Sequence, residues 1–516
     1  MNLEPANIKK NKKYLIGIDI GTSAAKITVI DLNGNVIYSN TYTYAIDYLP
    51  NGFVQQDPDE WYTSIVYLMK DFLLNIKPND SDILSIGISS QSNALAPVNG
   101  KGNLLHPAIL YLDKRVIDIC NSFTDTEEGK RIYEIGGSTL KPSYTGPQIS
   151  WIRKNEPVIY KNTYKFLTAN GYIIFRMTGT YSQDHTQTGM TGIFDRKQED
   201  WSEELLEYFD IDRKKLSDIY KSYDIVGKTG VRFKEDSGLP IGIPVIAGTL
   251  DVASTMLGSG CIDSGSCFIE MGSVINITVL TDKLIHDKNL QTYPSAIPGI
   301  NIVAGSVDGA GNTIKWFLDQ IYRGYGQDKE IADKEIFDIL EKQMPNTKIG
   351  AGNLMFLPFM AGMRTPRSDL NTKGAFLGLK ISTRKIDMFR SILEGCSYGL
   401  KYNLEFILAK DIELKKAIAS GGASKNKFWM QMISDVLDVA IKRSYYDSGA
   451  SVGSAMLAGI GSGAFNSFKQ AVKTVCKYDH DFTPVKERTG VYNKYYRQYK
   501  NFMKGLVLEL DNLERI

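Results

Sequence analysis

Two segments about half the chain apart share one design, and this repetition limits the fold more than any other feature of the sequence. Residues 14–30 (YLIGIDIGTSAAKITVI) predict an apolar strand, a polar turn at 19–23 and a second strand rich in β-branched residues. Residues 267–280 (CFIEMGSVINITVL) repeat this pattern, with Gly272-Ser273 at the turn. We interpret the pair as an internal duplication with a period of about half the chain.

The turn at 19–23 (DIGTS) has two interpretations. Glycine lets backbone N–H groups approach phosphate oxygens, hydroxyl groups donate hydrogen bonds, and an acid can hold water on Mg²⁺. The same residues also suit an ordinary turn between two strands. Under the first interpretation, the two copies of the turn face each other across a cleft and grip a triphosphate from both sides. Further on, Asn33-Gly34 predicts a tight primed hairpin turn, so the chain opens with about three antiparallel strands.

The composition excludes several classes of partner. A chain of 516 residues is too long for one core, so two or three domains are expected. The 60 Lys+Arg against 58 Asp+Glu leave a net charge of +2, which gives no electrostatic case for nucleic acid or a membrane surface. Residues 1–14 lack the apolar segment of a signal peptide, and no apolar run is long enough to span a bilayer.

The cysteines and histidines point to a reducing, cytoplasmic location. The five cysteines are odd in number, scattered and form no C-x-x-C pair, as expected for reduced thiols. The four histidines lie far apart in the sequence, which leaves little material for a structural zinc site or a histidine-based catalytic triad.

Strands and helices alternate along the chain, which predicts the α/β class. Asp57 is expected to cap a helix that begins at Pro58, and a strand over 83–89 leads into Gln91-Ser92-Asn93. A second strand over 243–248 ends in glycine, and Asp251 opens a helix of small residues. We place the domain boundary near residues 248–262.

Several motifs together resemble the FGGY family of carbohydrate kinases, within the actin, hexokinase and heat-shock-ATPase superfamily. Residues 374–379 (GAFLGL), followed by the stretch 387–394, match one family signature; residues 143–152 match the other, except that Gln148 replaces the usual lysine. Residues 356–369 resemble the family's LPY-x-x-GER-x-P stretch, and 420–423 (SGGA) its glycine-rich adenosine loop. The resemblance covers nearly the whole chain, from about residue 14 to 465.

The resemblance implies two ribonuclease-H-like domains flanking a deep cleft, in which ATP, Mg²⁺ and a small sugar meet. The expected domains are an N-terminal sugar-binding domain over 1–250 and a C-terminal nucleotide-binding domain over 251–516. The resemblance also implies which residues bind the nucleotide, and Asp19 would order Mg²⁺ through water. The implied nucleotide-binding residues are Gly21, Thr22, Ser23, Gly272, Ser273, Gly311, Gly422 and Asn426.

On the sugar side, the family position of the catalytic aspartate falls on Asp251. The alternative for this residue is a plain helix cap, worth about 1 kcal/mol of stability. The other implied substrate contacts are Gln91, Ser92, Asn93 and Tyr111. Xylulokinases of the family typically have Gln-Met-His-Gly where this chain has Gln91-Ser-Asn-Ala, and Val252 follows the aspartate instead of Asn or Gln. An unmatched buried polar group costs about 1–3 kcal/mol, enough to change sugar preference by tens-fold.

The substrate is therefore open among D-xylulose, another ketose such as ribulose, a polyol such as glycerol, and a sugar acid such as gluconate. An actin-like or chaperone ATPase would share the phosphate turns but would have no sugar-facing acid, and an inactive paralogue is a third alternative. The helix over 449–459 (GASVGSAMLAG) is expected to pack closely behind the adenosine loop. The oligomeric state is open, with a homodimer as one alternative.

Overall fold

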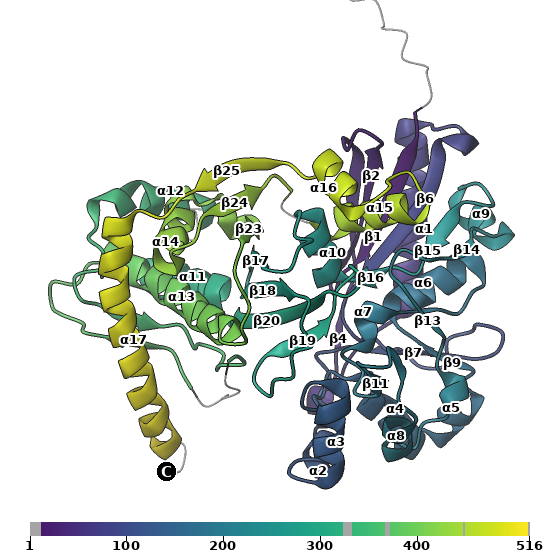
Figure 1. Cartoon of the computed structure of the whole chain (residues 1–516), viewed down its shortest axis with the longest axis horizontal. Coiled ribbons are helices and arrows are strands. Elements are labelled where there is room, and N and C mark those ends of the chain that lie inside the picture. Colours follow the sequence, from purple (N-terminus) through teal and green to yellow (C-terminus); the bar gives the residue numbers. More distant parts are fainter. Residues whose placement is uncertain (1–11, 324–332, 367–371, 447–448, 514–516) are drawn as a thin grey trace, which may run out of the picture. The chain divides into compact units, whose positions relative to one another are not determined.

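The computed structural model describes residues 12–323, 333–366, 372–446 and 449–513 (Figure 1). The expectation about the N-terminal leader therefore rests largely on residues outside the described ones, as does the end of the stretch 356–369. The described residues form two compact units. Unit 1 comprises 12–262, 293–301 and 449–476, and unit 2 comprises the described parts of 263–292, 302–446 and 477–513.

Unit 1 is built on a seven-stranded sheet. The central strand β1 pairs antiparallel with β2 and parallel with β6, so the opening strands form the expected meander. In spatial order the strands are β14 (Ile225–Lys228), β15 (Pro244–Ile246), β6 (Ile83–Ser90), β1 (Tyr14–Ile20), β2 (Ala24–Asp31) and β3 (Val36–Thr43), with β16 (Thr249–Leu250) also pairing with β6.

Two helices cover opposite faces of this sheet. Ile16 and Ile18 of β1 belong to the core cluster that contains the apolar side of α1 (Pro58–Ile76), including Trp61. Gly17 alternates to the other face, where it meets Ser451 of α15 (Gly449–Gly461). The Asp57 carboxylate caps α1 by accepting from the N–H of Asp59, as the sequence predicts for Asp57.

The remaining elements of unit 1 complete its core and carry its loops. They include a three-stranded sheet and three strand pairs. The strands are β4 (Asp47–Tyr48), β5 (Val54–Gln56), β7 (Ala96–Val98), β8 (Ala108–Ile109), β9 (Lys165–Leu167), β10 (Gln183–Asp184), β11 (Phe194–Asp195), β12 (Asp200–Trp201) and β13 (Ile219–Tyr220). The helices are α2 (Ile117–Ser122), α3 (Glu127–Gly136), α4 (Thr145–Asn155), α5 (Pro157–Asn162), α6 (Ala169–Thr178), α7 (His185–Thr188), α8 (Glu203–Tyr208), α9 (Val231–Ser237), α10 (Asp251–Gly258) and α16 (Phe468–Val475).

Unit 2 repeats the plan of unit 1, which confirms the duplication. Its central strand β17 pairs antiparallel with the next strand, β18, and parallel with β23, as β1 pairs with β2 and β6. In spatial order the strands are β19 (Gln291–Pro294), β20 (Asn301–Val307), β18 (Ile275–Thr281), β17 (Ser266–Met271), β23 (Lys416–Ser420), β24 (Ile441–Ser444) and β25 (Tyr478–Phe482).

The helices of unit 2 surround a large apolar core that includes Phe389, Trp429 and Tyr499. The long helix α13 carries the second half of the family signature, and its Arg390 forms a buried ion pair with Glu394. The helices and the remaining strand pair are α11 (Ala310–Phe317) continued by a π-helical turn (Leu318–Tyr322), α12 (Asp333–Gln343), α13 (Lys385–Leu408), α14 (Lys427–Leu437), α17 (Lys486–Leu513), β21 (Met355–Leu357) and β22 (Ala375–Leu377).

Two local expectations are wrong. The turn after β2 is not a primed hairpin turn, because only Gly34 has a positive φ while Asn33 does not. Instead, the Asp31 carboxylate accepts from the backbone N–H groups of Asn33 and Asn35. Helix α15 packs closely, as expected, but not behind the adenosine loop: its contacts are with β1, β2, β6 and α10 of unit 1.

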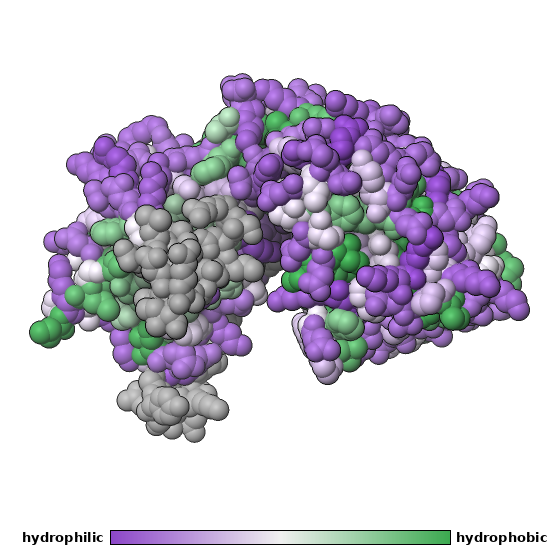
Figure 2. Space-filling view, turned by 90° about the horizontal axis from the view of Figure 1, so that it is seen from below, coloured by the Kyte–Doolittle hydropathy of each residue, from purple (hydrophilic) through white to green (hydrophobic). Residues whose placement is uncertain are grey.

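The surface is mixed in polarity. On the face shown in Figure 2, hydrophilic residues cover most of the area, and hydrophobic residues are interspersed among them. Among the residues that the structure describes, no helix combines the length and the apolar character needed to cross a membrane.

Candidate active site

Two side chains of unit 1, Tyr44 and Gln56, form hydrogen bonds to the backbone of the first glycine turn, residues 21–23. The Tyr44 hydroxyl donates to the carbonyl oxygen of Gly21 at 2.5 Å, and the Tyr44 N–H donates to that of Ser23 at 3.1 Å. The Gln56 amide donates to the carbonyl oxygen of Thr22 at 2.6 Å. Burial and the nearby carboxylate of Asp19 raise the pKa of Tyr44, so this phenol keeps its proton as a donor.

The orientation of these carbonyls decides where the turn's donors point. In a trans peptide the C=O and N–H groups point in opposite directions. The carbonyl oxygens of Gly21 and Thr22 point towards Tyr44 and Gln56. The N–H groups of the same two peptide bonds, which belong to Thr22 and Ser23, therefore point away from these side chains, as in anion-binding turns. This arrangement favours the phosphate-cradle interpretation over an ordinary turn.

Asp19 precedes this turn on β1, opposite Lys26 of β2 and beside Ser89 of β6. The Ser89 hydroxyl donates to Oδ1 of Asp19 at 2.8 Å, which fixes the carboxylate at the end of the strand. Among the described residues, no group of three or more His, Cys, Asp or Glu side chains is arranged to hold a metal ion. A cation at Asp19 would therefore rely on water and phosphate oxygens for most of its ligands.

Gln56 also connects the turn to the predicted sugar side. Its oxygen accepts from the Trp61 indole at 3.1 Å and from Nε2 of Gln91 at 3.0 Å. Because Trp61 can only donate, the orientation of the Gln56 amide is fixed, and so is that of Gln91. The backbone N–H of Gln91 donates to the carbonyl oxygen of Ile20, the last residue of β1 before Gly21. The predicted phosphate and sugar residues of unit 1 thus belong to one hydrogen-bonded group.

Asp251 reaches the same edge of the sheet by a different route. The strand expected over 243–248 is β15, and Gly248, with φ of +81°, separates it from the short β16; a β-carbon at Gly248 would lie 2.2 Å from the carbonyl oxygen of Ile88. The short β16 then pairs parallel with Ser89 and Ser90 of β6, and Asp251 follows as the first residue of α10. Leu250, rather than Asp251, occupies the cap position of α10, but the Asp251 carboxylate accepts from the N–H of Val252 in the first turn at 2.7 Å, so both interpretations of Asp251 stay open here.

The other predicted sugar contacts differ in their exposure. Asn93 is fully buried, with φ of +48°, and its amide donates to the carbonyl oxygens of Ser143 and Met190 at 2.9 and 2.7 Å. Asn93 therefore holds the turn together through its donors. Ser92 and Tyr111 are partly exposed, and both lie in turns at the ends of strands.

The loop that carries Tyr111 is anchored by a buried ion pair. Arg115 donates two hydrogen bonds to Asp113, both at 2.9 Å, and its guanidinium lies over the rings of Phe53 and Trp151. Asp113 also accepts from the N–H of Val54 at 2.7 Å. The Asp-x-Arg pattern of this chain is thus structural, and it fixes the backbone two residues from Tyr111.

In unit 2, the predicted nucleotide residues converge at the carboxyl end of β17. A β-carbon at Gly311, in the first turn of α11, would lie 2.4 Å from the carbonyl oxygen of Gly272. The N–H of Asn312 donates to the carbonyl oxygen of Ser273 at 3.2 Å. Gly421 is equally close, since its β-carbon would lie 2.6 Å from the carbonyl oxygen of Met271. Three backbones approach one another here because glycine occupies the contact points.

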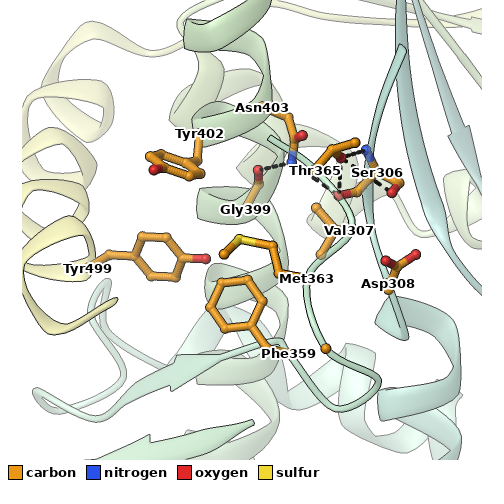
Figure 3. A pocket seen from close by; sticks show the side chains of 11 residues that line it. Ser306, Val307, Asp308, Phe359, Met363, Thr365, Gly399, Tyr402, Asn403 and Tyr499 are labelled. Carbon is orange, nitrogen blue, oxygen red and sulfur yellow. Dashed lines mark hydrogen bonds between the residues drawn. The ribbon is translucent and has the colours of Figure 1, made fainter. Parts of the chain in front are cut away.

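Side chains of neighbouring segments form hydrogen bonds to β20, the strand that leads to Gly311. Ser306 at the end of β20 donates its N–H to the Thr365 hydroxyl at 2.6 Å, and its carbonyl oxygen accepts from Asn403 of α13 at 3.1 Å (Figure 3). Asp308, two residues on, accepts a bidentate pair of hydrogen bonds from Arg364. These contacts surround a small pocket and hold the turn before α11 in place.

The glycine-rich segment 420–426 forms the turn between β23 and α14. Gly421 has φ of +98°, and a β-carbon at Gly422 would meet no atom within 4 Å. Asn426 caps α14 by accepting from the N–H of Trp429 at 2.7 Å, and its buried Nδ2 has no hydrogen-bond partner. A glycine with open space beside it and an unsatisfied amide donor fit the binding of an aromatic base that carries acceptor nitrogens.

Sequence reasoning missed several residues that organise the site: Tyr44, Gln56, Asp184, Thr186 and Gln187. Gln56 immediately precedes the capped start of α1, and Asp184 caps α7, which is a weak signal because α7 is only four residues long.

Comparison with known proteins identifies the class. The model described as "FGGY family of carbohydrate kinases, N-terminal domain" matches residues 14–258, and its C-terminal counterpart matches residues 273–462. The chain belongs to the FGGY family of carbohydrate kinases. It is an ATP-dependent carbohydrate kinase, with the two-domain α/β fold of the actin and hexokinase superfamily.

Individual relatives cover nearly the whole chain. The xylulose kinase of Staphylococcus xylosus is 28% identical over 94% of this chain and 99% of its own length. The gluconokinase of Bacillus subtilis is 24% identical over 96% of this chain and 99% of its own length. Among solved structures, the ligand-bound xylulose kinase from Lactobacillus acidophilus superposes with a TM-score of 0.88 and 23% identity, covering 97% of this chain and 100% of that one.

Proposed function

We propose that this kinase transfers the γ-phosphoryl group of ATP to a hydroxyl of a ketopentose, with D-xylulose as the first substrate to test. The observation that carries the proposal is the pairing of β16 with β6. It brings Asp251 to the same strand ends as the Gly21 turn and Gln91. The similarity to xylulose kinases over nearly full length supports the choice of sugar.

Asp251 is proposed as the general base. Phosphoryl transfer requires positioning, neutralisation of charge on the phosphate and a group that takes the proton of the attacking hydroxyl. Asp251 supplies a carboxylate at the start of a helix, beside the predicted sugar contacts. Gln91, Ser92, Asn93 and Tyr111 are proposed to define the sugar site, with Asn93 acting mainly through the turn that it holds.

The two glycine turns are proposed to hold the phosphates. In unit 1, Thr22 and Ser23 present N–H groups away from Tyr44 and Gln56, whereas the Gly21 N–H donates to the carbonyl oxygen of Ala24 at 2.9 Å, so Gly21 is proposed to allow close approach of the backbone to a phosphate. In unit 2, the residues proposed for the phosphates are Gly272, Ser273 and Gly311, and those for the adenosine are Gly422 and Asn426.

Mg²⁺ is proposed to accompany ATP, with Asp19 ordering it through water. The carboxylate fixed by Ser89 at a strand end fits this role, because Mg²⁺ prefers oxygen ligands and keeps several waters. When bound, the ion would neutralise phosphate charge; the chain's part is to hold the Asp19 carboxylate in place.

The sequence domains 1–250, for the sugar, and 251–516, for the nucleotide, remain part of the proposal, whereas the compact unit 1 continues through Asp251 to residue 262 and includes 293–301 and 449–476. A cytoplasmic location is proposed because the reaction consumes ATP and the five cysteines, all described, form no disulfide with one another. A homodimer remains a prediction.

The similarity to a gluconokinase keeps a sugar acid as the second candidate substrate. The test measures ADP formation from MgATP with D-xylulose, D-ribulose, glycerol and D-gluconate. The proposal expects the highest kcat/KM with D-xylulose. Preference for gluconate would reject the ketopentose, ATP hydrolysis without any sugar would favour an actin-like ATPase, and no reaction with any sugar would favour an inactive paralogue.

A further inference from the structure

A buried carboxylate lies directly behind the proposed active site. Asp184, at the end of β10, is completely buried and caps α7. Its Oδ1 accepts from the N–H groups of Thr186 and Gln187 at 3.0 and 3.1 Å and from the Thr186 hydroxyl. Its Oδ2 accepts from Nδ2 of Asn170 at 2.7 Å. Burial raises the pKa of Asp184, while the hydrogen bonds from Thr186, Asn170 and Gln187 act in the opposite direction. All four donors are uncharged, and four hydrogen bonds donated to one carboxyl group fit its ionised form, which only accepts.

The Thr186 hydroxyl connects Asp184 to β16, the strand that ends one residue before Asp251. A carboxylate can only accept, so the single hydroxyl proton of Thr186 is committed to Asp184. The Thr186 oxygen is then oriented to accept, and it receives the N–H of Leu250 at 2.7 Å. Leu250 immediately precedes Asp251, so one peptide bond separates this hydrogen bond from the proposed base.

Asn170 holds the other end of the same short strand. Its Nδ2 donates to the carbonyl oxygen of Ala247 at 3.3 Å as well as to Asp184. Its oxygen accepts from the Thr168 hydroxyl at 2.8 Å, which fixes the amide in this orientation. The segment from Ala247 to Leu250 is therefore held at both ends by side chains that Asp184 orients.

The helix that Asp184 caps also holds the proposed sugar turn. Gln187 is fully buried, and its Nε2 donates to the carbonyl oxygen of Gln91 at 3.2 Å. Its Oε1 accepts from the N–H of Asn93 at 3.2 Å. One amide thus contacts the backbone at both ends of the three-residue turn, from a helix whose first N–H groups are bound to Asp184.

We propose that Asp184 is a positioning residue for phosphoryl transfer, aligning Asp251 through Thr186 and the Gln91–Asn93 turn through Gln187. In this role Asp184 acts without touching the substrate, by fixing the orientation of Asp251 relative to the Gln91–Asn93 turn. The proposal rests on the proposed role of Asp251. Misplacing a reacting group by about 1 Å can cost about 10²-fold in rate, so loss of this alignment should appear mainly in kcat.

The sharpest test is the pair Thr186→Val and Thr186→Ser. Valine keeps the shape and removes the hydroxyl, whereas serine keeps the hydroxyl. We expect Thr186→Val to lower kcat about 10- to 100-fold with a much smaller change in the KM for ATP, and Thr186→Ser to restore most of the loss. Thr163→Val is the matched control, since it removes a buried hydroxyl that donates to the Ile159 carbonyl oxygen within α5, whose C-terminal end Thr163 caps.

Hydrogen exchange at the Leu250 amide gives a readout that does not depend on the reaction. The amide should be protected in the wild type and in Thr186→Ser, and should exchange faster in Thr186→Val. Unchanged Leu250 protection, unchanged kcat, or an equal kcat loss in Thr163→Val would overturn the positioning role. If Thr186→Val does not fold, Asp184→Asn serves instead, because it keeps an acceptor for the α7 cap but places an amide donor against Asn170.

Failure of the proposed function is distinguishable from failure of this inference. Wild-type kcat in Asp251→Asn would show that the base is misassigned, whatever Thr186 does. If Asp251→Asn is inactive while the Thr186 and Asp184 variants keep wild-type kcat, the base stands and the positioning role is rejected.

Discussion

Gly17 of β1 lies so close to α15 that a β-carbon at this position would stand 1.8 Å from the carbonyl oxygen of Ser451. The same holds on the neighbouring strand, where a β-carbon at Gly87 would stand 2.0 Å from that of Ser454. Gly17 and Gly87, which pair on neighbouring strands, thus allow the small residues of α15 to pack directly against the centre of the sheet in unit 1.

Replacing Gly17 by alanine should destabilise the protein by about 1–3 kcal/mol, because the clash is with backbone and neither partner can turn away. Thermal or urea unfolding of the variant measures the loss. Gly100→Ala is the control, since a β-carbon there meets no atom within 4 Å and the free energy of unfolding should hardly change. Equal stability of the two variants would mean that β1 and α15 are further apart than described.

Two glycines of the proposed phosphate site should respond differently to substitution. A β-carbon at Gly272 meets only the Val274 carbonyl oxygen, at 3.6 Å, so Gly272→Val should keep the fold but obstruct a phosphate oxygen. Gly311→Ala should lose stability as well, because its β-carbon would collide with Gly272. Calorimetry with MgATP and a thermal melt separate the two effects. Wild-type ATP affinity in Gly272→Val would remove this turn from the nucleotide site.

The buried pair Arg390–Glu394 allows a stability prediction within the family signature. Both side chains are 3% exposed, and Glu394 also accepts from the N–H of Gly350. Arg390→Met should cost about 3–5 kcal/mol, because it leaves a buried carboxylate without its cation. Adding Glu394→Leu should recover part of this loss, and a double-mutant cycle measures the coupling.

The exposed pair Arg131–Glu204 provides the comparison for that cycle. Its side chains are 45% and 38% exposed, so solvent screens their attraction, and Arg131→Met should change stability far less. If Arg390→Met and Arg131→Met lower the free energy of unfolding by the same amount, burial does not explain the contribution of the Arg390–Glu394 pair to stability.

The duplicated strand–turn–strand pattern was enough to predict an internal repeat and the position of both glycine turns, while the alternation of strands and helices predicted the α/β class. It worked because a glycine, a hydroxyl residue and β-branched strands are local signals. The packing partner of α15 was not predictable in this way. Small residues on α15 indicate a close contact, but its partners Gly17 and Gly87 lie near the other end of the chain, and no local pattern connects them.

Part of the site was likewise beyond the sequence. Gln56 acts through a hydrogen bond to a backbone group distant in sequence, the Thr22 carbonyl oxygen. Asp184 bonds the nearby Thr186 and Gln187, and these two side chains contact the distant backbone groups. A glutamine before a helix and an aspartate at a helix cap are common, and nothing local marks these two. Asn93 as a sugar contact stays a prediction, and its buried donors serve backbone carbonyls, which its residue type alone does not reveal.

Asp251→Asn tests the central claim most directly. The amide keeps the size of the side chain but cannot accept a proton as the carboxylate does. With D-xylulose, or with whichever sugar gives the highest activity, kcat should fall about 10²–10⁴-fold. MgATP affinity and the melting temperature should stay close to those of the wild type. A near-wild-type kcat in Asp251→Asn would contradict the account, because another group would then have to take the proton.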